Sequence, residues 1–142
     1  MNSVLVLGDW TDRFQEVLMV KHVMIIDDSP ADQFYAQAII SAMDVDVKID
    51  QAYDGIEGLE LLDAMATPPD LIFLDVNMPR MNGHEFLESY DKVKDTGTVI
   101  VMLTSSDQTS DREQAFKYDC IKDYLVKPML ADKLKELFSE IS

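Results

Sequence analysis

Acidic side chains follow two apolar segments of this chain. Asp27 and Asp28 come directly after His22–Ile26, and Asp75 ends the run Leu71–Asp75. Carboxylates that crowd together repel one another and raise each other's pKa unless a cation joins them. A hard divalent ion with oxygen ligands, above all Mg²⁺, balances such charges. The three aspartates therefore indicate a magnesium site, provided that the fold brings them together.

An amine and a hydroxyl follow two further apolar segments, and with a metal they would suit phosphoryl transfer. Asp75 can act as a nucleophile, because carboxylates form aspartyl-phosphates where the charge in transit is neutralised. Lys127, after Tyr124–Val126, can bring a positive charge to the phosphoryl oxygens. Thr104, after Val99–Leu103, can donate a hydrogen bond to the same oxygens. These residue types predict a phosphoryl-accepting site.

Each of these residues also has an ordinary structural explanation. Asp27 and Asp28 could be acids that precede a helix capped by Ser29. Asp75 alone is a common strand-ending carboxylate, and a lysine before a proline is more often a solvated charge than a ligand. The joint occurrence favours function, because unrelated surface residues would not all fall at the carboxyl ends of strands.

Five apolar segments alternate with five amphipathic ones, which predicts an α/β fold. The expected strands are His22–Ile26, a short strand containing Val47 and Ile49, Leu71–Asp75, Val99–Leu103 and Tyr124–Val126. Strands that alternate with helices form a doubly wound parallel sheet with helices on both faces. In the flavodoxin-like order 2-1-3-4-5, the strands that end in Asp27–Asp28 and in Asp75 lie side by side at the switch point.

The expected helices follow from caps and apolar spacing. Ser29 suits an N-cap, Pro30 the first helical position, and Asp32 the positive end of the helix dipole. Asp54 and Glu57 form a capping-box-like pair before the second helix. The predicted buried faces are Ala31, Phe34, Ala38, Ile39 and Ala42; then Ile56, Leu59, Leu62 and Ala66; Phe86, Tyr90 and Val93; Ala115 and Phe116 in a polar helix from Thr109 to Tyr118; and Leu130, Leu134, Leu137, Phe138 and Ile141.

Composition narrows the classes of function. A chain of 142 residues corresponds to one domain, and a formal net charge of -15 repels nucleic acids and anionic lipids. The single cysteine, Cys120, favours a reducing compartment. No apolar run is long enough to span a membrane, and the N-terminus lacks the basic flank of a secretory signal. We therefore expect a cytoplasmic protein without membrane insertion or direct nucleic-acid binding.

Four sequence pieces together resemble the receiver domain of bacterial two-component response regulators. They are Ile25–Asp28, Leu74–Pro79 with Met81 and Gly83, Leu103–Ser105, and Asp123–Pro128. The resemblance covers residues 22–142, the expected receiver domain. It implies that Asp75 takes a phosphoryl group from a partner kinase's phosphohistidine. It also implies that Asp28 and Asp75 bind Mg²⁺ directly, with the backbone carbonyl of Asn77 as a third ligand and Asp27 acting mainly through water.

The resemblance also implies a switch. Thr104 would move toward the phosphoryl group and Tyr124 would turn inward, which couples Asp75 to the surface of the fourth helix, fifth strand and fifth helix. From the sequence alone, plain packing explains Tyr124 equally well. The family's lysine-proline bond is usually cis, so we expect a cis Lys127–Pro128 bond. The sequence departs from the family pattern at Asn82, where Asp is common, and at Asp119–Cys120, where Gly-Ala is common.

Residues 1–21 have no counterpart in the family pattern. Val4–Leu7 reads as a short strand, and Phe14, Val17 and Leu18 have helical spacing. This N-terminal extension of unknown role could pack on the body or on a second subunit of a homodimer. Alternatively, the functional start is Met19 or Met24, and the first residues are loosely attached.

The expected function is that of a stand-alone, phosphorylation-controlled receiver, because the sequence ends just after the fifth helix. Its expected partners are a histidine kinase or histidine phosphotransfer protein and a downstream protein target. Such a receiver is not an enzyme in the ordinary sense, since it catalyses only its own phosphorylation and dephosphorylation. The alternatives are a receiver cut from a larger protein, a binding module that is not phosphorylated, and an aspartyl-nucleophile phosphohydrolase. The last class usually carries a second Asp where this chain has Asn77.

Overall fold

The computed structural model describes residues 20–43, 46–93, 97–105 and 109–141. The expected elements around Val4–Leu7 and Phe14–Leu18 lie outside these residues. Within them, strands and helices alternate throughout: β1 (His22–Ile26), α2 (Pro30–Met43), β2 (Lys48–Ala52), α3 (Gly55–Ala64), β3 (Leu71–Asp75), α4 (Gly83–Val93), β4 (Val99–Thr104), α5 (Thr109–Ala115), β5 (Ile121–Val126) and α6 (Ala131–Ile141). Among the described helices, none has the length and apolar character needed to cross a membrane.

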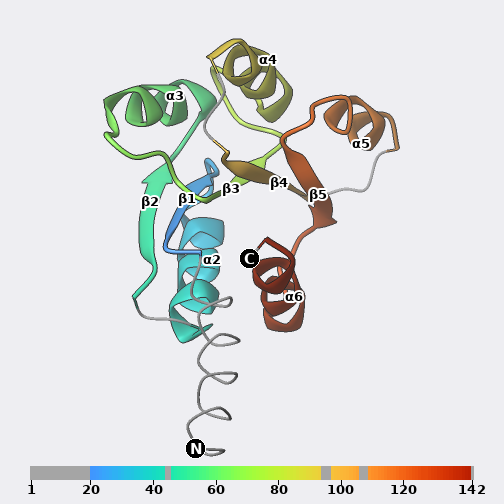
Figure 1. Ribbon diagram of the computed structural model, residues 1–142. Helices are drawn as coiled ribbons and strands as arrows, with labels where there is room; N and C mark the ends of the chain where they lie inside the picture. The colour runs from blue at the N-terminus through green and yellow to red at the C-terminus, as the bar shows by residue number, and fades with distance from the viewer. Residues whose placement is uncertain (1–19, 44–45, 94–96, 106–108, 142) are drawn as a thin grey trace, which may run out of the picture.

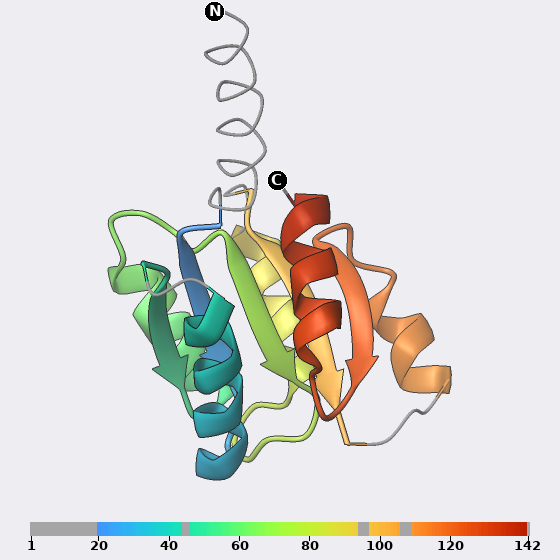
Figure 2. The same ribbon diagram turned by 90° about the horizontal axis from the view of Figure 1, so that it is seen from below.

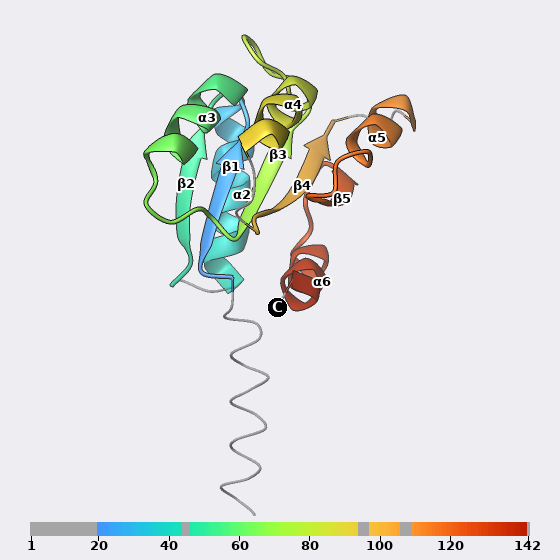
Figure 3. The ribbon, with the colours of Figure 1, turned by 45° about the horizontal axis from the view of Figure 1, so that its top comes forward.

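The five strands form one parallel sheet in the order β2-β1-β3-β4-β5, which confirms the predicted fold class and strand order (Figure 3). Helices α3, α4 and α5 lie on one face of the sheet, and α2 and α6 lie on the other (Figure 1). Figure 2 shows that the arrowheads of the strands all point to the same edge. Side chains at the carboxyl ends of neighbouring strands can therefore meet there.

The sheet separates two apolar cores, and β3 contributes to both. All five residues of β3 are buried, as expected for a central strand covered on both faces. Successive side chains point to opposite faces of a strand. Leu71 and Phe73 accordingly pack in the core beneath α2 and α6, while Ile72 and Leu74 pack in the core beneath the other helices. Asp75 continues this strand to the edge where the arrowheads end, so its backbone is fixed by both cores.

The predicted buried face of α2 is wrong. The buried residues of this helix are Gln33, Ala36 and Ile40, whereas Phe34 is 75% exposed. Ala31, Ala38 and Ala42 are also exposed, and Ile39 is partly buried. Apolar residues occur on every side of this helix, so their spacing did not define a single face. The buried face of α2 includes Gln33, although only apolar residues were predicted on that face.

Three further residues of the predicted helical faces are exposed, because each lies beyond the end of its helix. Ala66 follows α3, Phe116 follows α5, and Leu130 precedes α6. The predicted core positions Phe86, Tyr90, Ala115, Leu134, Leu137 and Phe138 are confirmed as buried. The side chain of Val93 lies outside the described set.

The predicted starts of α2 and α3 are confirmed. The N–H of Asp32 donates to Ser29 Oγ at 3.2 Å, and α2 begins at Pro30. Asp54 caps α3 by accepting a hydrogen bond from the N–H of Glu57 at 2.9 Å. These caps satisfy backbone donors that the helices leave free at their N-termini, and they fix the loops after β1 and β2.

Gly83 leaves no room for a side chain where α4 begins. Its N–H donates to the carbonyl of Val76 at 2.9 Å, and an added Cβ would lie only 2.6 Å from the backbone oxygen of Asp75. We expect Gly83→Ala to lower the free energy of unfolding by about 1–3 kcal/mol, because the backbone around Asp75 would have to shift. Urea denaturation measures this loss.

Gly58→Ala is the matched control for Gly83→Ala. Its Cβ would meet only side-chain atoms among its nearest neighbours, chiefly of Ile26, and alanine favours the helix. A smaller loss is therefore expected. Equal losses in the two variants would contradict the view that the contact with the Asp75 backbone is the costly one.

Candidate functional site

Three aspartates meet at the carboxyl ends of β1 and β3. Ile26 pairs with Leu74 in the parallel ladder, so the residues that follow them, Asp27 and Asp75, are neighbours across the two strands. One carboxylate oxygen each from Asp27, Asp28 and Asp75 lies within 4.8 Å of the others. Asp27 and Asp75 are buried, whereas Asp28 is exposed. The cluster is thus held by the sheet on one side and open to solvent on the other.

Burial raises the pKa of Asp75 to about 6, and the negative charge of Asp27 adds to this effect, while Lys127 opposes it. The net result is a buried carboxylate that lacks enough neighbouring positive charge to keep its ordinary acidity. A cation bound by several oxygen ligands would supply the missing positive charge. The cluster therefore fits Mg²⁺, which prefers carboxylate and carbonyl oxygens and leaves positions for water and phosphoryl oxygens.

Lys127 reaches the same cluster from the end of β5. Its ammonium donates to Asp27 Oδ2 at 2.7 Å and to Asp32 Oδ2 at 2.8 Å, and it lies 3.3 Å from Asp75 Oδ1. Burial lowers the pKa of Lys127, but the hydrogen bonds to Asp27 and Asp32 outweigh it, and the net pKa is raised. The side chain is therefore charged. The Lys127–Pro128 peptide bond is cis, as predicted.

Thr104 ends β4, the strand beside β3, and Tyr124 lies on β5, the next strand along the sheet. Asp75 pairs with Leu103 in the ladder, so Thr104 stands one residue further toward the edge that carries the cluster. Its backbone carbonyl accepts a hydrogen bond from the Lys127 N–H at 2.7 Å. Both side chains are buried, with Tyr124 only 2% exposed. Asn77 lies exposed in the loop after β3.

Gln33 holds the backbone next to the cluster in place, and this role was not predicted from the sequence. Its side-chain amide nitrogen lies within hydrogen-bonding distance of three carbonyls, those of Ile25 (3.0 Å), Asp27 (3.1 Å) and Ala52 (2.8 Å). These contacts join α2 to the ends of β1 and β2 and fix the backbone of Asp27. The available signal was the spacing of Gln33 with Ala36 and Ile40, which places a polar residue on a helical face.

Arg80 clamps the loop after β3 to the start of α3, and this pair was also missed. Its guanidinium donates to Asp54 Oδ2 from Nε at 2.7 Å and to Oδ1 from Nη2 at 2.9 Å. The hydrogen bond from Arg80 lowers the pKa of Asp54. The backbone of Arg80 has a φ of 62°, which is uncommon outside glycine. The clamp thereby fixes the loop that contains Asn77.

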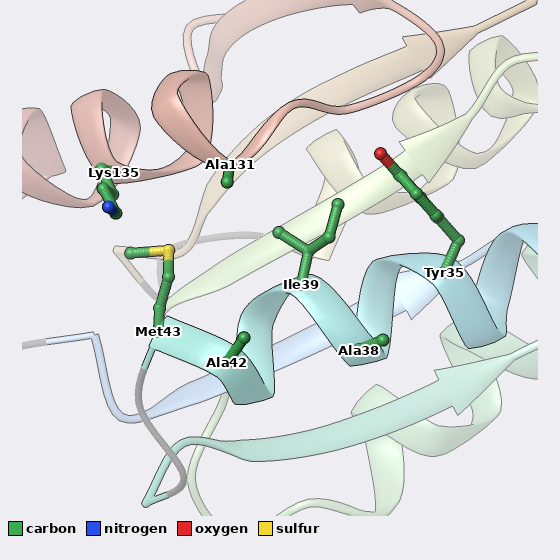
Figure 4. Close-up of a pocket in the computed structure, with 7 residues that line it drawn as sticks. All are labelled: Tyr35, Ala38, Ile39, Ala42, Met43, Ala131 and Lys135. Carbon is green, nitrogen blue, oxygen red and sulfur yellow. The ribbon is translucent and has the colours of Figure 1, made fainter.

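Described residues of α2 line two hollows, and one of these hollows borders the aspartate cluster. A cavity of about 230 Å³ is bordered by Lys127, Asp32 and Tyr35. A groove of about 670 Å³ runs between α2 and α6, with Ile39 and Met43 on one side and Ala131 and Lys135 on the other (Figure 4). Among the described residues that line this groove, Lys135 alone is charged. The groove thus lacks the carboxylates that the proposed chemistry requires.

The raised pKa of Asp75 predicts a pH-dependent penalty on the stability of the metal-free protein. Between its ordinary value of 3.8 and about 6, the folded state retains a proton that the unfolded state has lost. The penalty is therefore absent below pH 3.8 and complete above pH 6, where it amounts to about 2–3 kcal/mol. In the presence of EDTA, Asp75→Asn should exceed the wild type in stability by that amount at pH 7, and by little near pH 4.

Urea denaturation at a series of pH values measures this difference. Asp63→Asn removes an exposed carboxylate of α3 and serves as the control, with no comparable gain expected. A gain in Asp75→Asn that did not change with pH would contradict the assignment to Asp75 ionisation.

Comparisons with known proteins agree with this geometry. A family model described as the response regulator receiver domain matches residues 23–139. An uncharacterised response regulatory protein of Vibrio vulnificus is 34% identical over 120 residues, which are 84% of this chain and 46% of that protein. The chain thus spans less than half of that relative. PilH of Pseudomonas aeruginosa is 27% identical over 120 residues, which cover 95% of its length and 84% of this chain.

A solved structure shares the same architecture. A two-component response regulator from Cytophaga hutchinsonii superposes with a TM-score of 0.76 and 26% identity. The match covers 86% of this chain and 96% of that one.

Proposed function

Because this chain belongs to the response regulator receiver domain family, we propose that it is a receiver of two-component signalling whose phosphoryl acceptor is Asp75. The observation that supports this most directly is the meeting of Asp27, Asp28 and Asp75 with Lys127 at one edge of the sheet. These groups match the nucleophile, the metal ligands and the cation that phosphoryl transfer to a carboxylate requires.

In the proposed reaction, an Asp75 carboxylate oxygen attacks the phosphorus of a phosphohistidine in the partner. The P–O bond forms as the P–N bond breaks, and the histidine leaves. Lys127 neutralises charge on the phosphoryl oxygens, and Thr104 donates its hydroxyl hydrogen to them. Asp27, Asp28, Asp75 and the carbonyl of Asn77 would hold Mg²⁺, which supplies further charge neutralisation when bound.

The proposed output surface surrounds β5. A phosphoryl group adds a charge of about -2 and three acceptor oxygens, which can bias a two-state element. We propose that Thr104 and Tyr124 carry this change to α5, β5 and α6. Three large apolar side chains are exposed there, namely Phe116 (44%), Val126 (43%) and Leu130 (60%). Exposed apolar side chains of this kind support a protein-binding role for the surface.

The proposed partners follow from this chemistry. A histidine kinase or histidine phosphotransfer protein would supply the phosphoryl group in the cytoplasm, and a downstream protein would bind the surface around β5. The similarity to PilH, which the match covers almost completely, supports a receiver that acts by itself. The acidic net charge of -15 favours partners with basic docking surfaces over nucleic acid.

Incubation with Mg²⁺ and acetyl phosphate tests the proposal. We expect a base-labile mass increase of one phosphoryl group that requires Mg²⁺ and is prevented by EDTA. Beryllofluoride, which mimics the phosphoryl group, should shift the amide resonances of Thr104 and Tyr124. Failure of both reagents to produce a response with Mg²⁺ would overturn the proposed function.

A further inference from the structure

A fourth carboxylate, that of Asp32, contacts the Lys127 ammonium but is not part of the cluster that fits a metal ion. Asp32 lies in the first turn of α2, and its Oδ2 is 2.8 Å from Lys127 Nζ. It does not belong to the group of Asp27, Asp28 and Asp75 whose oxygens lie close together. Its side chain is 46% exposed, whereas that of Lys127 is 16% exposed. The contact therefore lies at the rim of the site, on the side where α2 begins.

Lys127 must span a considerable distance to reach the cluster. It follows β5, an edge strand, and β4 and β3 separate β5 from β1 in the sheet. A lysine side chain is flexible, and holding it in one position costs conformational entropy. The cavity of about 230 Å³ beside Lys127 leaves room for other positions of the side chain. An acceptor outside the cluster would restrict these other positions and favour the one beside Asp75.

Asp27 and Asp75 would hold the ammonium less firmly once a divalent cation occupied the cluster. Both belong to the group of carboxylates that fits such a cation, and a cation there would repel the ammonium and weaken its attraction to these carboxylates. Asp32 lies outside the cluster, so its charge stays available to Lys127. An ammonium has three N–H donors, which allows Lys127 to keep the bond to Asp32 and still donate toward Asp75.

We propose that Asp32 is a positioning residue for phosphoryl transfer, which holds the Lys127 ammonium beside Asp75 while a divalent cation occupies the cluster. This inference rests on the proposed function and extends it to a residue that acts through Lys127. Loss of Asp32 should weaken interactions with the phosphoryl group and leave cation binding nearly unchanged. A residue that merely stabilised the fold would not separate these two affinities.

The test uses Asp32→Ala, Asp32→Asn and the control Asp132→Ala in the full chain. Asp132 is an exposed acid in the first turn of α6, so its replacement removes the same charge from an equivalent helical position. NMR titrations would give the affinity for Mg²⁺ alone and the affinity for beryllofluoride at saturating Mg²⁺. Asp32→Ala should bind beryllofluoride about tenfold more weakly, because Lys127 loses the charged hydrogen bond that holds it beside Asp75 and must be ordered when the ligand binds. Its Mg²⁺ affinity should change less than about twofold, because such an exposed charge is largely screened.

Asp32→Asn keeps an acceptor oxygen and should lie between the wild type and Asp32→Ala. It also provides the measurement if Asp32→Ala does not fold. Unchanged or tighter beryllofluoride binding in both variants would overturn the inference, as would equal losses of Mg²⁺ and beryllofluoride affinity. A wild-type protein that bound no beryllofluoride with Mg²⁺ would instead overturn the proposed function itself.

Discussion

Replacing Asp75 with asparagine is expected to abolish phosphorylation. The amide has nearly the same size as the carboxylate but is a poor nucleophile, and it removes a negative ligand from the cluster. The rate should fall by at least about a thousandfold, as for the loss of other covalent nucleophiles. Mass spectrometry after incubation with acetyl phosphate and Mg²⁺, or with a phosphorylated kinase partner, would measure the loss.

The fold of this variant should remain intact, because removing a buried and poorly compensated charge stabilises the metal-free protein. Asp63→Asn, on the exposed side of α3, should accept the phosphoryl group at the wild-type rate. A base-labile phosphoryl group at full yield in Asp75→Asn would show that another residue is the acceptor.

Replacing Lys127 with alanine is expected to give the second-largest effect. This change removes the ammonium that lies 3.3 Å from Asp75. The rate of phosphorylation should fall by about 100-fold, which is typical for the loss of one group that stabilises developing charge. The affinity for Mg²⁺ should be unchanged or higher, because the ammonium competes with a cation for Asp27 and Asp75.

The same variant should shift the pH dependence of phosphorylation. Lys127 lowers the pKa of Asp75, so its removal should move the rise in rate to higher pH. Lys133→Ala is the matched control. Lys133 of α6 also pairs with an aspartate, Asp123 of β5 at 3.4 Å, but this pair does not include a residue of the cluster. Parallel losses of Mg²⁺ affinity and phosphorylation rate in Lys127→Ala would contradict its role toward the phosphoryl group.

The meeting of the aspartates could be predicted because it depends on regular structure. Asp27 follows β1 and Asp75 ends β3, and each comes directly after a run of apolar residues. Parallel strands bring their carboxyl ends to one edge. The sheet order then makes the two residues neighbours. The position of Lys127 near the cluster could be predicted for the same reason, because Lys127 also follows a strand. The predicted starts of α2 and α3 rested on caps that act within a few residues.

The supporting residues could not be predicted because they depend on contacts between distant parts of the chain. The pair of Arg80 and Asp54 joins two loops, and the bond between Asp32 and Lys127 joins the start of α2 to the end of β5. Local patterns carry no information about such distances. Gln33 was missed for a different reason, because α2 has apolar residues on all sides and its buried face was assigned wrongly.

Under the proposed Mg²⁺ site, the crowding of Asp27, Asp28 and Asp75 would also link the abundance of the protein to magnesium supply. An ion that binds only the folded state shifts the folding equilibrium by mass action. In a cell starved of magnesium, a larger share of the molecules would open transiently, and proteases degrade opened chains. The cellular half-life of this protein should therefore lengthen as free magnesium rises, even where no phosphoryl donor is present.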